Sequence, residues 1–65
     1  MADQLKAKLI YETAGNKYVY VVEIQLLDPR GAPIWCEVYR NTSQACAERF
    51  VGRNGFTLVA KGTRS

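Results

Sequence analysis

The run from Lys17 to Asp28, KYVYVVEIQLLD, constrains the fold of this chain more than any other segment. Every even-numbered position from Tyr18 to Leu26 in this run is apolar. Apolar side chains at every second position, rich in β-branched and aromatic types, predict a β-strand with one buried face. The odd-numbered positions mix three polar residues with three aliphatic ones, namely Lys17, Glu23 and Gln25 with Val19, Val21 and Leu27. We therefore expect the second face of this strand to be covered in part as well.

Three other segments predict strands around this one. Leu5–Glu12 also alternates, and Gly15 with Asn16 after it can close a hairpin onto the Lys17 strand. A loop from Asp28 to Pro33, with two prolines and a glycine, separates that strand from the alternating segment Ile34–Arg40. Phe56–Lys61 is a short fourth strand. The first three strands are expected to form an antiparallel meander, and the fourth flanks either the first or the third.

One helix is expected between the third and fourth strands. Asn41, Thr42 and Ser43 are three consecutive candidate N-caps, and the pair Asn41 and Gln44 has the spacing of a capping box. Asn54-Gly55 is a typical helix stop. The apolar residues between them have the spacing of one helix face: Cys46, Ala47, Phe50 and Val51.

These elements predict a single α+β domain over residues 1–65, with the order β-β-β-α-β and the helix packed on one face of the sheet. Residues 1–3 and 62–65 are expected to be frayed. A domain of this length removes only about 60% of its unfolded surface from water, so its stability margin is small. Self-association or binding to a partner would increase that margin.

Several classes of function are disfavoured by composition. The 65 residues contain no histidine, which removes the usual general base at neutral pH, so we predict no enzyme and no catalytic residues. Cys36 and Cys46 lack metal-ligand spacing and are expected to be free thiols, and the five glycines are isolated. We therefore predict no metal, no cofactor and no small-molecule substrate. No apolar run approaches the ~20 residues of a membrane span, and no secretion signal is visible, so a cytoplasmic location without membrane contact is expected.

The uncovered face of the sheet is the predicted functional surface. One short helix covers only one side, and a helix packed on the even-numbered face of the Lys17 strand leaves an apolar and aromatic surface on the other side. Such surfaces with polar rims are typical of interfaces. We therefore predict a small protein-binding module, an accessory or inhibitor protein of the kind that phages or mobile elements encode, which binds a protein partner or forms a homodimer. The predicted contact residues are Ile10, Val19, Val21, Trp35, Tyr39 and Val59.

Two alternatives remain open at this point. In the first, the protein binds nucleic acid, with bases stacked on Trp35 and Tyr39 and phosphates bound by Lys and Arg side chains. The net charge of +3, from nine Lys and Arg residues against six Asp and Glu, favours this alternative only slightly. The phosphate contacts would then be Lys6, Lys8, Lys17, Arg40, Lys61, Arg49 and Arg53. In the second, the helix covers the odd-numbered face, which would expose Tyr11, Tyr18 and Tyr20 instead.

Overall fold

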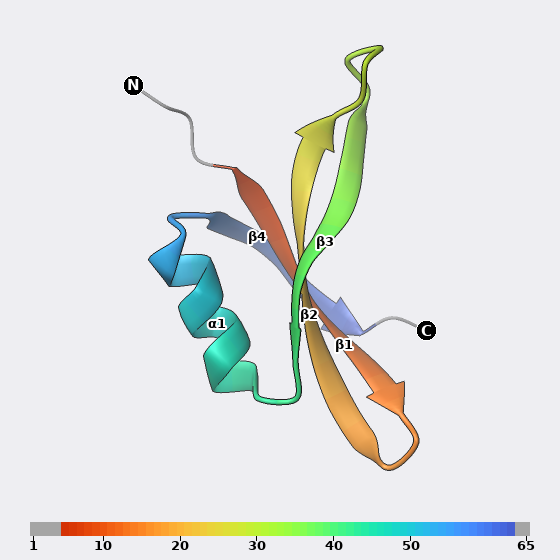
Figure 1. The fold of residues 1–65 in the computed structure, drawn as a ribbon, viewed down its shortest axis with the longest axis vertical. Helices are drawn as coiled ribbons and strands as arrows, with labels where there is room; N and C mark the ends of the chain where they lie inside the picture. The colour runs from red at the N-terminus through yellow and green to blue at the C-terminus, as the bar shows by residue number, and fades with distance from the viewer. Residues whose placement is uncertain (1–4, 64–65) are drawn as a thin grey trace.

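The computed structural model describes residues 5–63 as a four-stranded sheet with one helix (Figure 1). Its elements confirm the α+β class and the order β-β-β-α-β. They are β1 (Lys6–Ala14), β2 (Lys17–Leu27), β3 (Pro33–Asn41), α1 (Gln44–Arg53) and β4 (Thr57–Thr63). The ten residues of α1 are too few for this helix to cross a membrane, and it is the only helix among the described residues.

The sheet is mixed, with the strand order β3-β2-β1-β4. The first three strands form the predicted antiparallel meander, but β4 pairs parallel to β1. After β3, the chain crosses the sheet through α1 and forms β4 at the edge beside β1. Strands that run parallel in one sheet need a long crossover connection of this kind. The fourth strand therefore lies beside the first strand rather than the third.

The ends of the chain differ in part from the prediction. Gly62 and Thr63 were expected to be frayed, but they belong to β4 and pair with Ile10 and Tyr11 of β1. Ladder pairing to β1 is the physical reason that the strand continues beyond Lys61. The predicted fraying of residues 1–3 and 64–65 lies outside the described residues.

A glycine closes the first hairpin turn, and an aspartate side chain stabilises the second. Ala14 pairs with Lys17, and Gly15 at the first central position has a φ of 66° while Asn16 has a negative φ, which is the pattern of a type II′ turn. At the other turn, Asp28 Oδ1 accepts hydrogen bonds of 2.8 Å from the backbone N–H groups of Arg30 and Ala32. This second turn ends the β2–β3 arm, residues 26–34, which projects at the top of Figure 1.

Local hydrogen bonds fix both ends of α1. Ser43 is the N-cap, and its Oγ accepts from the backbone N–H of Cys46 at 3.3 Å. The predicted capping box of Asn41 with Gln44 is wrong, because Asn41 is the last residue of β3 and its Oδ1 accepts from the Ser43 N–H instead. At the other end, Gly55 has a φ of 71° and follows the helix as predicted.

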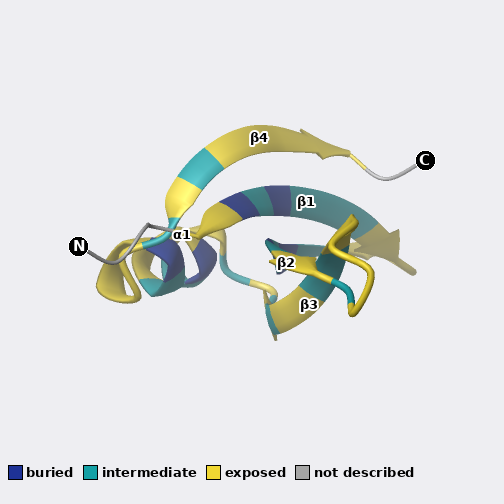
Figure 2. Cartoon of the chain, turned by 90° about the horizontal axis from the view of Figure 1, so that it is seen from above, coloured by how far each residue is buried: buried dark blue, intermediate teal, exposed yellow. Residues whose placement is uncertain are grey.

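The core lies between α1 and the even-numbered face of β2, which confirms the main prediction for the helix (Figure 2). The inverted alternative is wrong, since Tyr11 and Tyr20 pack against this core and their rings meet edge to face at 5.0 Å. Tyr18 of the same set is nevertheless 61% exposed, near the β1–β2 turn. The buried cluster consists of Ala7, Leu9, Val22, Ile24, Ala47 and Val51.

A β-bulge in β3 changes which side chains meet the helix. Val22 pairs with Tyr39 and Glu23 pairs with Glu37, so Val38 is an extra residue on β3. A residue inserted in this way reverses the alternation of the strand beyond it. Tyr39 was expected on the uncovered face, but the bulge turns it toward α1, where its ring stacks on Phe50 at 4.4 Å with an interplanar angle of 13°.

The position of Tyr39 leads to a stability prediction. Tyr39→Ala is expected to lower the free energy of unfolding by about 2 kcal/mol, because it removes a ring packed against the core and its stacking on Phe50. Val38→Ala removes a side chain that is 40% exposed and is expected to cost less than about 1 kcal/mol. Urea unfolding followed by far-UV circular dichroism measures both. A larger loss for Val38→Ala than for Tyr39→Ala would contradict this placement of the bulge.

Candidate functional site

The open face is the side of the sheet opposite α1, and strand register assigns its residues. Residues that pair across two strands share a face, so each strand contributes alternate positions. Among residues 5–63, no helix covers this side. Over the three strands of the meander this face includes Lys6, Lys8, Ile10 and Glu12 of β1, Lys17, Val19, Val21, Glu23, Gln25 and Leu27 of β2, and Trp35, Glu37 and Arg40 of β3.

A charged side chain covers the middle of the open face. Arg40 donates to Glu37 through Nε at 3.1 Å and through Nη2 at 2.9 Å, and its Nη1 lies 3.5 Å from Glu12 Oε2. Because Arg40 lies on β3 and Glu12 on β1, this side chain crosses β2 next to Val21, its register partner. Val21 is fully buried, although it lies on the side away from the helix. The hydrogen bond to Glu37 also raises the pKa of Arg40 above its usual value.

The single tryptophan is partly covered in the same manner. Lys8 of β1 reaches across β2, and its Nζ lies 4.0 Å from the centroid of the Trp35 ring on β3. A cation over an indole ring at this distance contributes about 0.5–1 kcal/mol at an exposed site. Trp35 is thereby oriented on the open face and remains half-buried.

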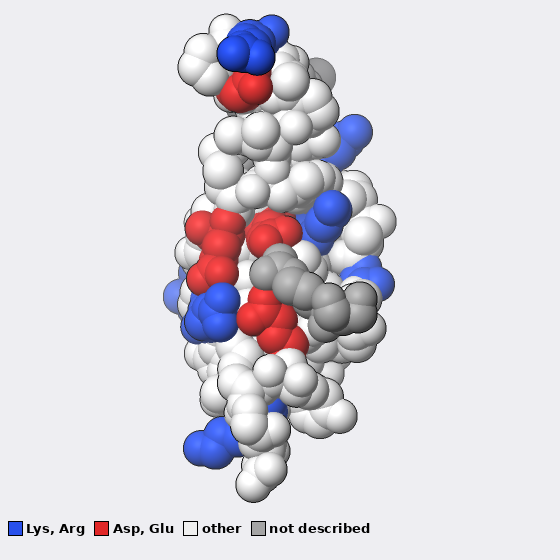
Figure 3. Space-filling model, turned by 90° about the vertical axis from the view of Figure 1, so that its right-hand side faces the viewer, with Lys and Arg blue, Asp and Glu red and all other residues white. Residues whose placement is uncertain are grey.

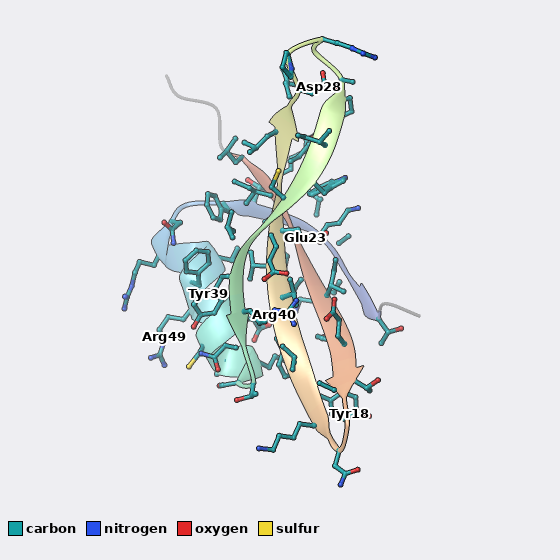
Figure 4. All side chains as sticks on the ribbon, turned by 45° about the vertical axis from the view of Figure 1, so that its right-hand side comes forward. Tyr18, Glu23, Asp28, Tyr39, Arg40 and Arg49 are labelled. Carbon is teal, nitrogen blue, oxygen red and sulfur yellow. The ribbon has the colours of Figure 1, made fainter. Side chains whose placement is uncertain are left out.

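Charges of both signs surround these apolar residues. Glu12, Glu23 and Glu37 all lie on the open face, and Figure 3 shows acidic side chains over its middle with basic ones around them. Figure 4 shows Glu23 and Arg40 from neighbouring strands near the centre of the sheet. The centre of the open face is therefore a network of charges of both signs rather than a basic surface.

The β2–β3 arm adds exposed apolar surface next to Trp35. Leu27 is 70% exposed and lies diagonally across the strand pair from Trp35, since it pairs with Pro33. On the other side of the arm, Leu26 and Ile34 are opposite each other and are 37% and 41% exposed. The arm therefore presents aliphatic side chains on both of its faces.

Leu26 and Ile34 were missed from the sequence, because their alternation assigns them to the buried side. A length comparison would have found them. The eleven residues of β2 span about 36 Å, whereas the ten residues of α1 span about 15 Å. One such helix covers less than half of the strand, so an end of the inward face must remain outside the core.

The six predicted contact residues do not form one continuous surface in the structure. Ile10, Val19 and Trp35 are half-buried on the open face, as expected. Val21 is on that face but buried, and Tyr39 is on the opposite face. Val59 is the extra residue of a second bulge, on the edge strand β4, and it is 49% exposed at the opposite edge of the sheet from Trp35.

The seven predicted phosphate contacts fall on two sides of the molecule. Lys6, Lys8, Lys17 and Arg40 lie on the open face, but Arg40 is ion-paired and Lys8 covers Trp35. On the other side, Lys61 Nζ lies 3.0 Å from Glu48 Oε1, an interaction that raises the pKa of Lys61. Arg49 and Arg53 belong to α1.

The chemistry available on the described surface is limited. A hollow of about 300 Å³ between β1 and β4 is lined by Lys8, Ile10, Lys61 and Thr63 among others, and its ionisable side chains are both lysines. Cys36 and Cys46 are free cysteines, and both are half-buried. Among residues 5–63, no three His, Cys, Asp or Glu side chains lie close enough together to hold a metal ion.

Comparison with known proteins adds no assignment, because no family model, curated protein or solved structure matches the chain. A functional assignment therefore depends on the residues of the chain itself.

Arg40 provides a direct test of how the open face is covered. Arg40→Ala removes both the ion pairs and the methylene groups beside Val21, whereas Arg40→Met keeps an unbranched apolar chain there. We expect Arg40→Ala to lower the melting temperature more than Arg40→Met does, as measured by differential scanning calorimetry. Equal losses would mean that the charge of Arg40, and not its chain, protects Val21.

Proposed function

We propose that this protein is a non-enzymatic binding module that docks on a protein partner through the open face and the adjoining β2–β3 arm. The observation that carries this proposal is the continuity of Trp35 with the exposed aliphatic residues of the arm. Leu27, at 70% exposure, is the most exposed large apolar side chain among the described residues, and it lies diagonally across from Trp35. Aromatic and aliphatic centres with charged rims are typical of protein interfaces.

The way in which the β2–β3 arm projects from the rest of the sheet also favours a docking role. Beyond the part of the sheet that α1 covers, β2 and β3 continue as a hairpin toward the Asp28 turn (Figure 1). A two-stranded hairpin is only marginally stable alone in water. A partner that encloses the arm would bury Leu26 and Ile34 on one side and Leu27 on the other.

A protein partner fits the charges of the open face better than nucleic acid does. Glu12, Glu23 and Glu37 lie beside Trp35 and Arg40, where phosphates would approach, and like charges repel. Nucleic-acid surfaces instead gather unopposed Lys and Arg. Within this proposal the chain acts stoichiometrically as an accessory or inhibitor protein, and pairing with a second copy is one form that the interaction takes.

Site-specific crosslinking tests the proposal and captures the partner in the same step. The photoreactive residue p-benzoyl-phenylalanine is placed at Leu27 in one variant and, as a matched control, at Tyr18 in another; these side chains are 70% and 61% exposed at opposite ends of β2. Irradiation in cells, followed by mass spectrometry, is expected to give a discrete adduct from position 27 and none from position 18. Equal adducts at both positions would contradict the proposal.

A charge substitution then measures the contribution of the arm. Leu27→Glu is expected to weaken binding of the crosslinked partner, or of the second copy, at least about tenfold, because it places a carboxylate in a desolvated contact. Tyr18→Glu is expected to leave the affinity unchanged. Isothermal titration calorimetry measures both variants against the purified partner, and equal affinities for the two would argue against the arm as the contact.

Trp35 fluorescence distinguishes the nucleic-acid alternative. The protein is titrated with single-stranded and duplex oligonucleotides at low ionic strength, where electrostatic binding is strongest. No change in emission is expected. Quenching that weakens as salt is added would overturn the proposal in favour of base stacking on the open face.

A further inference from the structure

A groove lies on the helix side of the molecule, between α1 and the edge strand β3. Its volume is about 210 Å³, and it is lined by Tyr39, Cys46, Arg49, Phe50 and Arg53. The stacked rings of Tyr39 and Phe50 form its apolar part, and Figure 4 shows Tyr39 beside α1, the helix that carries Arg49. Asn41 Nδ2 donates to Tyr39 Oη at 2.9 Å and fixes the orientation of the phenol.

The two arginines of this α1–β3 groove are not ion-paired within the described part of the chain. Arg49 and Arg53 are four residues apart, so they share a face of α1 with about 5–6 Å between their Cβ atoms. Both are exposed, and within residues 5–63 neither forms an ion pair, whereas Arg40 and Lys61 do. Two guanidinium groups beside an aromatic pair form a site for anions that carry some apolar surface.

We infer that the α1–β3 groove binds a short acidic peptide segment of a partner protein. Carboxylates of that segment pair with Arg49 and Arg53, and a neighbouring apolar side chain packs against Tyr39 and Phe50. The size of the groove favours a peptide over nucleic acid, because two cations one helical turn apart match two side chains rather than a phosphate backbone, which is bound by many cations. This site is on the opposite side of the sheet from Trp35, so it is independent of the open face.

Peptide selection tests the chemistry of the ligand without a known partner. Immobilised wild-type protein and the double variant Arg49→Gln/Arg53→Gln are used to select from the same display library of random peptides. Asp and Glu are expected to be enriched in the peptides that bind the wild-type protein, with an apolar residue nearby, and not in those that bind the variant. No enrichment of acidic residues, or the same enrichment with both proteins, would overturn the inference.

A matched control separates this groove from general electrostatic attraction. Arg30→Gln/Lys17→Gln also removes two exposed cations, one from each of the two hairpins and neither lining the groove. In fluorescence anisotropy with a labelled selected peptide, the groove variant is expected to weaken binding at least about tenfold and the control less than about twofold. Equal weakening by the two variants would show that net charge alone attracts the peptide.

Two further measurements locate the peptide and test competing anions. Cys46 lines the groove and Cys36 does not, so bound peptide is expected to slow alkylation of Cys46 by iodoacetamide while Cys36 reacts at an unchanged rate. Inorganic phosphate and a single-stranded oligonucleotide are expected not to displace the peptide at equal charge concentration. Displacement by either one, or unchanged reactivity of Cys46, would contradict an acidic peptide in this groove.

Discussion

Burial of β2 on both of its faces is the constraint on which the rest of the structure depends. Val22 and Ile24 face α1, while Val21 faces the other way, and Val21 and Val22 are both fully buried. Residues 5–63 contain one helix with which to cover two faces. Side chains from the flanking strands cover the second face: Arg40 crosses from β3 to Glu12 of β1, and Lys8 crosses from β1 to Trp35 of β3. Long amphipathic side chains thus shield apolar surface where no element of secondary structure is available.

This arrangement gives the two sides of the sheet different surface chemistry. On the open face, Arg40 pairs with carboxylates and Lys8 covers an indole ring, and the accessible apolar surface lies farther out, at Leu27 and the arm. On the helix side, Glu48 is paired with Lys61, while Arg49 and Arg53 face the groove without a partner among the described residues. An apolar arm and a cationic groove therefore lie on separate parts of one small domain, where each can contact a different feature of a partner.

Periodicity in the sequence predicted the strands, the helix and its inward face, because the apolar positions of each segment follow a single period. Tyr39 was misplaced because a bulge depends on pairing between strands: nothing within Ile34–Arg40 shows that Val38 is the extra residue opposite β2. The burial of Val21 was also missed, since it depends on Arg40 reaching a carboxylate that is 28 positions away in the chain. Leu26 and Ile34 follow the inward pattern but lie beyond the end of the helix. Local pattern thus predicted the elements, and long-range pairing determined which residues are accessible.

The parallel pairing of β1 and β4 has a mechanical consequence. The chain enters the sheet at the start of β1 and leaves it at the end of β4, and these two strands run side by side in the same direction. A force that pulls these two ends apart slides one strand along the other and loads all of the ladder hydrogen bonds between them together. The hairpin of β2 with β3, pulled at its open end, would instead lose its bonds one pair at a time. The fold therefore resists tension best when the force acts between the start of β1 and the end of β4.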